Sequence, residues 1–379
     1  MRSVRFATPS IGEEEIAEVV ETLRSGWIAA GPRVARFEER FRDLVGARHA
    51  VATSSCTGAL HIAFTALGAK GGDVLMPTMT FAATALSAHH AGGRPVLCDV
   101  DDDTLNVDVK EVARRASPAT RVVVAMHYAG LPCDVDGLRA IADDRGAKLV
   151  EDAAHGIGAA SKGRAVGSIG DAGAFSFYAN KNMTTVEGGM LTTSIDEVAD
   201  RARPLRLQGM TRDAWKRDEK ASWRYDIVEA GFKYPMSDVQ AAIGLRQLDK
   251  LTAFQARRVE IAARYRAGLA GAKGLRLPAE APAGSTHGNH LFVVRADERG
   301  LGRDALALKL REDGVETSVH FVPLHLHPLF QREWGYKEGD FPVAERAFRE
   351  ILSLPMHVGL SDDDVDHVID RVRVALAAG

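Results

Sequence analysis

Short apolar runs alternate with stretches of helical periodicity from residue 50 onward, and this alternation is typical of parallel strands joined by helices. Before this region, residues 12–23 predict a helix with acidic residues in its first turn, and apolar residues at helical spacing in 34–44 predict a second helix. We therefore expect an α/β domain, and its strands are predicted at 50–53, 74–76, 95–99, 122–125, 148–151, 174–177 and 190–193.

The pattern changes after residue 193. Residues 194–231 are polar and rich in arginine and lysine, which favours a long excursion over the mouth of a ligand site. A long helix is expected to start at Ser237 and Asp238. The final third then indicates a strand, a helix and a strand, at 291–297, 303–313 and 316–321. We interpret the chain as a large domain, residues 1–250, and a smaller C-terminal α+β domain, residues 251–379.

Composition excludes several classes of protein. The chain has 379 residues, of which 46% are hydrophobic and 26% charged, as in a globular protein. Its net charge of -3 provides no basic field for nucleic acid or an anionic membrane, and no stretch approaches the roughly 18 apolar residues of a membrane span. Cys56, Cys98 and Cys133 show no paired spacing, and the acidic N-terminus lacks an apolar signal core, so we expect a cytoplasmic protein with free thiols.

The stretch FSFYANKNMTTVEGGML, residues 175–191, places Lys181 between the end of an apolar strand and a glycine-rich bend. Such a position can hold an amine inside the protein, where it loses its proton readily and can form a Schiff base with an aldehyde. Most lysines are solvated, so taken alone Lys181 is better interpreted as a surface residue. Its chemistry therefore depends on what else the chain brings to the same place.

A second candidate is the run TSSCTG, residues 53–58, which follows a predicted strand and opens a helix. Free N–H groups at a helix start favour phosphate, while Thr57 adds a hydroxyl and Gly58 permits close approach. Simple N-capping explains the same residues about equally well. Ser176, five residues before Lys181, can add a second hydroxyl to the same group.

A third candidate is KLVEDAA, residues 148–154, a predicted strand that ends in an acidic pair. Ligands gather at the carboxyl ends of strands in such a sheet, so Asp152 is expected near the segment 176–181. An ionised Asp152 suits a buried cation such as a protonated pyridine nitrogen, and a helix cap is the alternative. His155 either contacts such a ring or is a partly buried histidine with its own partners.

No metal site is expected. The acidic run at residues 99–103 imitates the start of a calcium loop, but the glycine and glutamate that such a loop needs are missing. The histidines His320, His325 and His327 have no cysteine or carboxylate in their run to complete a metal site. A role facing a substrate suits them better.

Together these motifs resemble the DegT/DnrJ/EryC1/StrS family of pyridoxal-phosphate sugar aminotransferases over nearly the whole chain. The motifs occur in the family's order: SGWIAAGP, SSCTGALHIAF, MPTMTFAATA, PVLCDVDDDTLNVD, AMHYAGLPCDVD, VEDAAHGIGA, FSFYANKNMTTVEGGM, RLQGMTRDAWKR, GFKYPMSDVQAAIGLRQL, SVHFVPLHLHP and ILSLPMHVGLSDDDVD. The resemblance implies the aspartate-aminotransferase-like fold, fold type I, with a mixed, mostly parallel seven-stranded sheet in the large domain. It also implies pyridoxal 5'-phosphate as the cofactor and a homodimer with shared active sites.

Position by position, the resemblance makes Lys181 the lysine that carries the cofactor and moves the proton, and Asp152 the partner of the pyridine nitrogen. It places His155 near the ring oxygen, the ring of Phe81 against the cofactor, and Lys233 of the neighbouring subunit at the phosphate. The phosphate end of the site that it implies consists of Cys56, Thr57, Gly58 and Ser176. The substrate contacts that it implies are Trp27, Ile28, Arg224, His320 and His325.

The implied reaction transfers the amino group of L-glutamate to a keto-sugar attached to a nucleotide diphosphate. The motif RLQGMTRDAWKR is similar to that of members acting at C4 of a 4-keto-6-deoxy sugar. The alternatives are amination at C3, amination of a keto-cyclitol, and a cofactor-binding regulatory protein without turnover. Three residues depart from the family's pattern and leave the substrate-side details open: Pro235, Val186 and Gln208.

Overall fold

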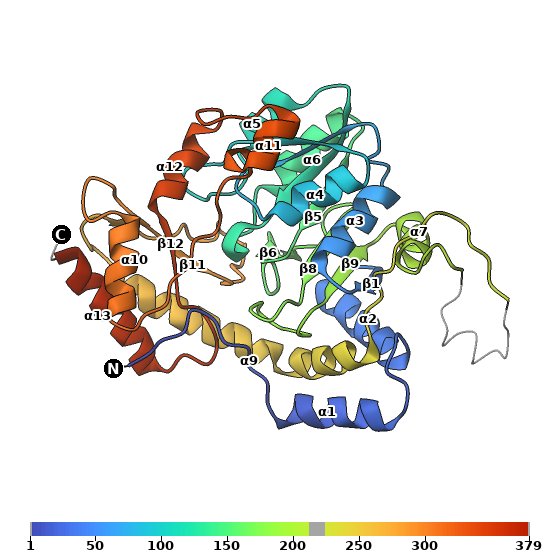
Figure 1. Ribbon diagram of the computed structural model, residues 1–379, viewed down its shortest axis with the longest axis horizontal. Coiled ribbons are helices and arrows are strands. Elements are labelled where there is room, and N and C mark those ends of the chain that lie inside the picture. The colour runs from blue at the N-terminus through green and yellow to red at the C-terminus, as the bar shows by residue number, and fades with distance from the viewer. Residues whose placement is uncertain (1, 212–223, 378–379) are drawn as a thin grey trace.

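The computed structural model describes residues 2–211 and 224–377. Its largest feature is a seven-stranded sheet (Figure 1) in the order β1-β9-β8-β5-β4-β2-β3, with β9 antiparallel to both of its neighbours and the other pairs parallel. The strands are β1 (His49–Thr53), β2 (Asp73–Pro77), β3 (Arg94–Cys98), β4 (Thr120–Met126), β5 (Lys148–Asp152), β8 (Ala172–Ser176) and β9 (Gly189–Thr193). All seven strands predicted from the sequence are confirmed, each within two residues at either end.

Both faces of this sheet are covered by helices. Val122 and Val124 of β4 pack in the cluster that includes α3 (Cys56–Ala66), whereas Val123 packs with α5 (Val109–Arg115) and α6 (Val135–Asp144). Helix α4 (Ala82–His90) lies beside α3 (Figure 1). Helices on both faces leave no room for a ligand there, and the buried strands are near-continuous apolar runs. Ligands therefore reach such a sheet at the strand ends.

Helix α9 (Asp238–Leu269) runs along the base of the molecule (Figure 1) and joins its two parts. It begins at the predicted residues with a capping box, in which the backbone N–H of Gln240 donates to the Ser237 hydroxyl at 3.2 Å. Its first half packs with α1 (Glu13–Arg24) and α2 (Pro32–Val45), and its second half packs with α13 (Asp362–Ala377). The predicted division after residue 250 falls inside this continuous helix, and the division itself stays a prediction.

The C-terminal part has a three-stranded antiparallel sheet. Its strands are β10 (Leu275–Arg276), β11 (Phe292–Ala296) and β12 (Ile351–Leu354), and its helices besides α13 are α10 (Arg303–Glu312), α11 (Pro328–Trp334) and α12 (Pro342–Glu350). The strand predicted at 316–321 is wrong: the segment makes one bridge, from Ser318 to Ser353, and then leaves the sheet. It leaves because His320 and Phe321 turn into a cavity and Pro323 has no N–H to donate.

The predicted excursion over the ligand mouth is wrong for its first part. Residues 196–206 form helix α7 (Asp196–Arg206), which packs on α3 and β1, away from the cavity. The guanidinium of Arg201 donates to the carbonyls of Thr65 and Ala66, at 2.9 and 3.1 Å, so its charge stabilises the end of α3. The basic residues at 212–223 lie outside the described residues.

Smaller elements complete the chain. Strands β6 (Ala160–Ser161) and β7 (Arg164–Ala165) form a two-stranded sheet, and two short 3-10 helices are η1 (Tyr128–Gly130) and η2 (Leu324–Leu326). Among residues 2–211 and 224–377, no helix is both long and apolar enough to cross a bilayer. The same residues hold no group of three or more His, Cys, Asp and Glu side chains arranged for a metal ion.

We expect Gly189→Ala to destabilise the protein by about 2–3 kcal/mol, measured by urea unfolding. Strand β9 passes so close to the start of α3 that a Cβ at Gly189 would lie 2.3 Å from the carbonyl carbon of Ser55, which is backbone and cannot move away cheaply. The matched control is Gly300→Ala in an exposed turn, where the nearest atom is 3.6 Å away. Equal stability of the two variants would contradict this close approach.

Candidate active site

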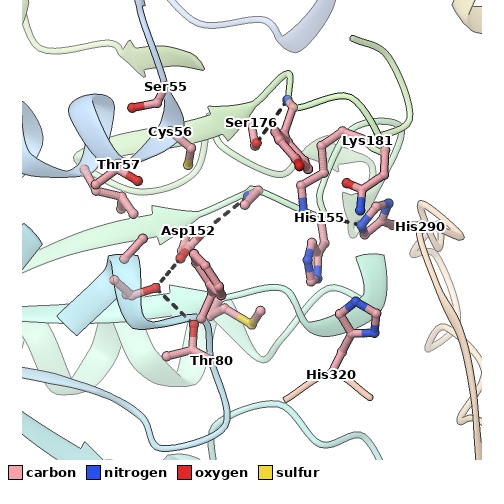
Figure 2. Close-up of a pocket in the computed structure, with 18 of the residues that line it drawn as sticks. Ser55, Cys56, Thr57, Thr80, Asp152, His155, Ser176, Lys181, His290 and His320 are labelled. Carbon is pink, nitrogen blue, oxygen red and sulfur yellow. Dashed lines mark hydrogen bonds between the residues drawn. The ribbon is translucent and has the colours of Figure 1, made fainter. Parts of the chain in front are cut away.

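A cavity of about 330 Å³ lies at the carboxyl ends of the central strands. Figure 2 shows Ser55, Cys56 and Thr57 on one side of it and Lys181 and His290 on the other. Strands β5 and β8 are parallel neighbours, so Asp152 and Ser176, the last residues of each, reach the same edge of the sheet. The predicted proximity of Asp152 to the segment 176–181 is confirmed, because all of these elements line one cavity.

Lys181 stands on a tight turn after β8. Its backbone N–H donates to the Tyr178 carbonyl at 3.0 Å. The Phe177 N–H donates to the Gly188 carbonyl at 2.9 Å and closes the turn. Burial lowers the pKa of the Lys181 ammonium from 10.5 to about 8, although the nearby carboxyl of Asp152 acts in the opposite direction. The lysine is therefore not an ordinary surface residue, and a useful fraction of it is neutral at physiological pH.

The carboxyl of Asp152 lies at the floor of the cavity and is 4% exposed. Its Oδ2 accepts a hydrogen bond from the Thr84 hydroxyl at 2.6 Å, and its Oδ1 accepts one from the Ala154 N–H at 3.1 Å. The Thr80 hydroxyl lies 3.0 Å from that of Thr84 and extends the chain (Figure 2). Burial raises the pKa of Asp152 while the two donors oppose it, so a cation in the cavity would favour the ionised form.

The neighbouring Glu151 has a different task. Because side chains alternate along a strand, its carboxylate points away from the cavity and accepts backbone N–H groups of Gly167, Ile169 and Gly170 at 2.6–2.7 Å. It also lies 3.1 Å from Nε2 of the buried His127. Of the acidic pair in KLVEDAA, Glu151 therefore stabilises the fold and Asp152 faces the cavity.

The start of α3 offers backbone donors to an anion. The Ser55 hydroxyl caps the helix by accepting the Gly58 N–H at 3.1 Å, which leaves the N–H groups of Cys56 and Thr57 without an intrahelical acceptor. Ser176 lies at the adjacent end of β8 and adds a hydroxyl. Gly58 itself does not line the cavity: it packs under Tyr234, whose ring atom would lie 3.1 Å from an added Cβ. Burial raises the pKa of the Cys56 thiol, so this group is neutral.

Aromatic side chains form the walls. Phe81 precedes α4 and is 64% exposed, and its ring centroid lies 6.0 Å from that of Phe321. His155 is buried on the other wall, 4.4 Å from the ring of His290, and its Nδ1 has no hydrogen-bond partner among the described residues. Burial and the positive charge of Lys181 hold the pKa of His155 well below its usual value, so the ring is neutral.

Several functional candidates were not visible in the sequence. His290 lies just before β11, and its Nε2 is 3.4 Å from Nζ of Lys181. Thr80 and Thr84 support Asp152, and their spacing of four residues at a strand end and helix start is the one signal that indicates them. His320, which was predicted to face a substrate, does line the cavity, and its Nδ1 lies 2.9 Å from the Ser353 hydroxyl.

The structure does not bring every predicted residue to the cavity. His325 is fully buried between the Thr78 hydroxyl, at 2.8 Å, and a Glu345 carboxylate oxygen, at 2.9 Å, so neither ring nitrogen is available to a substrate and that prediction is wrong. Four further residues lie outside the cavity of their own chain: Trp27, Ile28, Arg224 and Lys233. Their assigned roles stay predictions.

The mixed sheet with its single antiparallel strand, and the lysine cavity at the carboxyl ends of the parallel strands, define an enzyme of the aminotransferase class with fold type I. Residues 9–373 match the model of the DegT/DnrJ/EryC1/StrS aminotransferase family, and the chain belongs to this family. The fold class and the family predicted from the motifs are confirmed.

Similarity to individual proteins extends over almost the full chain. The chain is 46% identical over 373 residues to the spore coat polysaccharide biosynthesis protein SpsC of Bacillus subtilis (strain 168), covering 97% of this chain and 96% of SpsC. The solved structure of Spr1654 from Streptococcus pneumoniae in its PLP form superposes with a TM-score of 0.93 at 32% identity, covering 100% and 99% of the two chains. DesI, solved in the presence of its TDP-sugar product, gives a TM-score of 0.88 at 34% identity, with 100% and 94% covered.

We expect Lys181→Met to stabilise the protein without cofactor at pH 7 by about 1–2 kcal/mol in free energy of unfolding. Burying the ammonium costs free energy, and this cost is fully present below the folded-state pKa of about 8. It disappears as the pH rises from there to the ordinary lysine pKa of 10.5, above which the amine is neutral in both states. Urea unfolding of wild type and variant at pH 7 and at pH 10 measures the difference.

Lys250→Met is the matched control with the opposite sign. Nζ of Lys250 lies 2.9 Å from Glu14 and 2.8 Å from Glu15. Burial lowers the pKa of Lys250, but the hydrogen bonds to these two carboxylates outweigh it and the pKa is raised. This variant should therefore lose stability at pH 7. A Lys181→Met protein that is less stable than wild type at pH 7 would show that the buried amine carries no such cost.

Proposed function

We propose that this protein is a pyridoxal-phosphate-dependent aminotransferase that moves the amino group of L-glutamate to a keto-sugar linked to a nucleotide diphosphate, at C4 of a 4-keto-6-deoxy sugar. The observation that carries the proposal is Lys181, whose burial lowers its pKa to about 8 in a cavity that also holds a buried carboxylate and a helix start. An amine that is partly neutral near physiological pH can attach to an aldehyde and later carry a proton.

The residues present fit pyridoxal phosphate at each of its polar groups. The N–H groups of Cys56 and Thr57, with the Ser176 hydroxyl, suit the phosphate, and the buried Asp152 suits the protonated ring nitrogen. The unpartnered Nδ1 of His155 suits the ring oxygen. The amine of Lys181 suits the aldehyde, and the exposed ring of Phe81 suits stacking on the cofactor ring.

When bound, pyridoxal phosphate supplies an electron sink that takes up and releases an amino group. Lys181 would take a proton from the carbon of the amino donor and return a proton to the carbon of the acceptor, because its pKa of about 8 lets both protonation states exist near neutral pH. Asp152 would keep the ring nitrogen protonated, and Thr84 orients that carboxylate. The rings of His155 and Phe321 stack with their centroids 5.8 Å apart and give the cavity an apolar wall.

The acceptor class rests on the relatives. SpsC functions in spore coat polysaccharide biosynthesis and DesI was solved with a TDP-sugar product, which supports a nucleotide-linked sugar here. Amination at C4 rests on the resemblance of the motif RLQGMTRDAWKR, the second half of which lies outside the described residues. His320 faces the cavity with a neutral ring, since burial and Lys181 lower its pKa to about 4, and we assign it to the substrate. The cysteines, buried and unpaired, suit a reducing cytoplasm.

We also propose a homodimer with shared active sites. Large apolar side chains that line the cavity stay exposed, with Phe81 at 64% and Tyr178 at 48%, and Val186, which precedes the cavity residue Glu187, is 55% exposed. Such a patch on a soluble protein is typical of an interface. Lys233 is exposed and outside the cavity of its own chain, as expected of a residue that reaches the phosphate of the partner's site.

The substrate is tested by incubating the protein and L-glutamate with a panel of nucleotide-linked 3-keto and 4-keto sugars and cyclitol ketones. Mass spectrometry and NMR identify the product, and we expect the amino group at C4 of a 4-keto-6-deoxy sugar. An amino group at C3, or an aminated cyclitol, would contradict the assigned acceptor. A protein that binds cofactor but never converts it with glutamate would overturn the enzymatic proposal in favour of a regulatory protein.

Lys181→Ala should lose turnover by about 10²–10⁴-fold, because the proton carrier is removed while the rest of the cavity remains. Steady-state rates with the identified acceptor measure the loss. Lys162→Ala is the control, because this exposed lysine pairs with Asp136 at 2.7 Å on the surface. A Lys181→Ala protein that turns over at the wild-type rate would exclude Lys181 from the mechanism.

The shared site is tested with hybrid dimers. Lys181→Ala and Lys233→Ala are each expected to be inactive or nearly so, and their chains are mixed after mild dissociation. If Lys233 acts in the partner's site, each hybrid dimer regains one complete site, so a 1:1 mixture recovers about a quarter of the wild-type activity. If Lys233 acts in its own chain, or if no dimer forms, the mixture recovers nothing.

A further inference from the structure

Among residues 2–211 and 224–377, His290 is the one imidazole that forms a hydrogen bond with the amine of Lys181. It is 4% exposed, it lies at the entry of β11, and its Nε2 is 3.4 Å from Nζ of the lysine (Figure 2). It comes from the C-terminal part of the chain, whereas Lys181 comes from the large sheet. The contact therefore joins the two parts of the fold at the reactive nitrogen.

The tautomer of His290 is determined by Asn182. The amide NH₂ of Asn182 donates to two carbonyls, of Ile157 at 3.1 Å and Gly288 at 2.7 Å, which fixes the orientation of the amide. Its Oδ1 is thereby directed at Nδ1 of His290, 3.1 Å away. An amide oxygen only accepts, so Nδ1 carries the hydrogen. In the neutral ring, Nε2 then presents its lone pair to Lys181.

The groups around His290 keep this ring neutral. Burial first, and then the positive charges of Lys181 and Arg258, hold the pKa of His290 well below its usual value. The nearby imidazoles of His155 and His320 are neutral, because burial and Lys181 lower their pKa values as well. Arg258 is a buried cation directly behind the ring: its Nη1 donates to the carbonyls of Asn289 at 3.1 Å, His290 at 3.4 Å and Met356 at 3.2 Å. A second positive charge on the imidazole would be repelled from both sides.

We propose that His290 is a positioning residue for Lys181: its neutral imidazole accepts a hydrogen bond from Nζ through Nε2 and holds the free lysine at the cavity wall whenever the lysine is not attached to the cofactor. The inference rests on the proposed function. A neutral acceptor suits a proton carrier because it can accept from the ammonium and from the amine alike, whereas an imidazolium could accept from neither. Lys181 would thus remain next to the reacting carbon through the proton transfers.

The same geometry predicts how His290 affects the protonation of Lys181. The groups that act on Nζ are Asp152 of β5, whose carboxylate favours the ammonium, and His290, whose Nε2 accepts from it. The nearby Cys56 thiol of α3 is neutral, because burial raises its pKa. Removing the acceptor leaves the buried ammonium less stabilised, so the amine should lose its proton at a lower pH. Replacing the histidine by a side chain that still accepts a hydrogen bond should restore the wild-type value.

The test uses the rate at which cofactor-free protein attaches pyridoxal phosphate, followed by visible absorbance from pH 6 to pH 10. Attachment joins Nζ to the aldehyde carbon with release of water and requires the neutral amine, so the midpoint of the pH profile reports the pKa of Lys181. We expect His290→Phe to lower this midpoint by roughly one pH unit. His290→Gln, whose amide oxygen can accept from Nζ, should stay close to wild type.

Two further variants make the comparison decisive. His357→Phe is the matched control, because His357 is also a buried histidine but lies outside the cavity, with its Nε2 3.2 Å from the Arg5 carbonyl oxygen. The midpoint of this variant should equal that of wild type. His290→Leu repeats the test with a smaller side chain in case Phe prevents folding. A midpoint unchanged in His290→Phe or His290→Leu would overturn the role of His290. Absence of attachment in wild type would overturn the proposed function itself, so the two failures are distinct.

Discussion

A buried amine and a buried carboxylate that do not pair with each other are the constraint on which this site depends. No ion pair joins Lys181 and Asp152 in the described part of the chain; each is held by a neutral group instead, the amine by His290 and the carboxylate by Thr84. Leaving two such groups unpaired in a desolvated cavity costs free energy. Because neither group is paired with the other, both remain available to a ligand. Unpaired buried charges are for this reason typical of functional sites.

The topology of the large sheet places these groups. Parallel pairing of β5 and β8 brings Asp152 and Ser176 to one edge, and the antiparallel β9 returns along β8 to the start of α3. Only a glycine at position 189 permits that return, since any side chain there would meet the backbone of Ser55. The start of α3 is therefore fixed next to the strand end that carries Ser176. The proposed cofactor site follows from the sheet, whereas the proposed substrate side depends on segments beyond it.

Much of the large domain could be predicted from the sequence because strands buried on both faces are continuous apolar runs of a few residues. The same logic failed at 316–321, where an apolar, β-prone run leaves the sheet to line the cavity. Lys181, Asp152 and Ser176 were predictable as a group because each lies at the end of a strand or just past it. Thr57 was predictable because it opens a helix.

The histidines were not predictable in this way. His290 acts through Asn182, which lies 108 residues earlier in the chain, and no local pattern reveals that pairing. His325 was assigned to substrate on its residue type, yet Thr78 and Glu345 enclose it in the core. Whether a histidine faces a ligand or a buried partner is decided by tertiary contacts. The residues next to each histidine in the sequence do not indicate which partner it meets in the fold.

The proposed mechanism requires that Lys181 carries the cofactor. The most direct measurement is to load the protein with pyridoxal phosphate, reduce it with borohydride so that the attachment becomes permanent, and map the modified peptide by mass spectrometry. We expect one pyridoxyl group per chain, on Lys181. Modification of a different lysine, or of none, would contradict it.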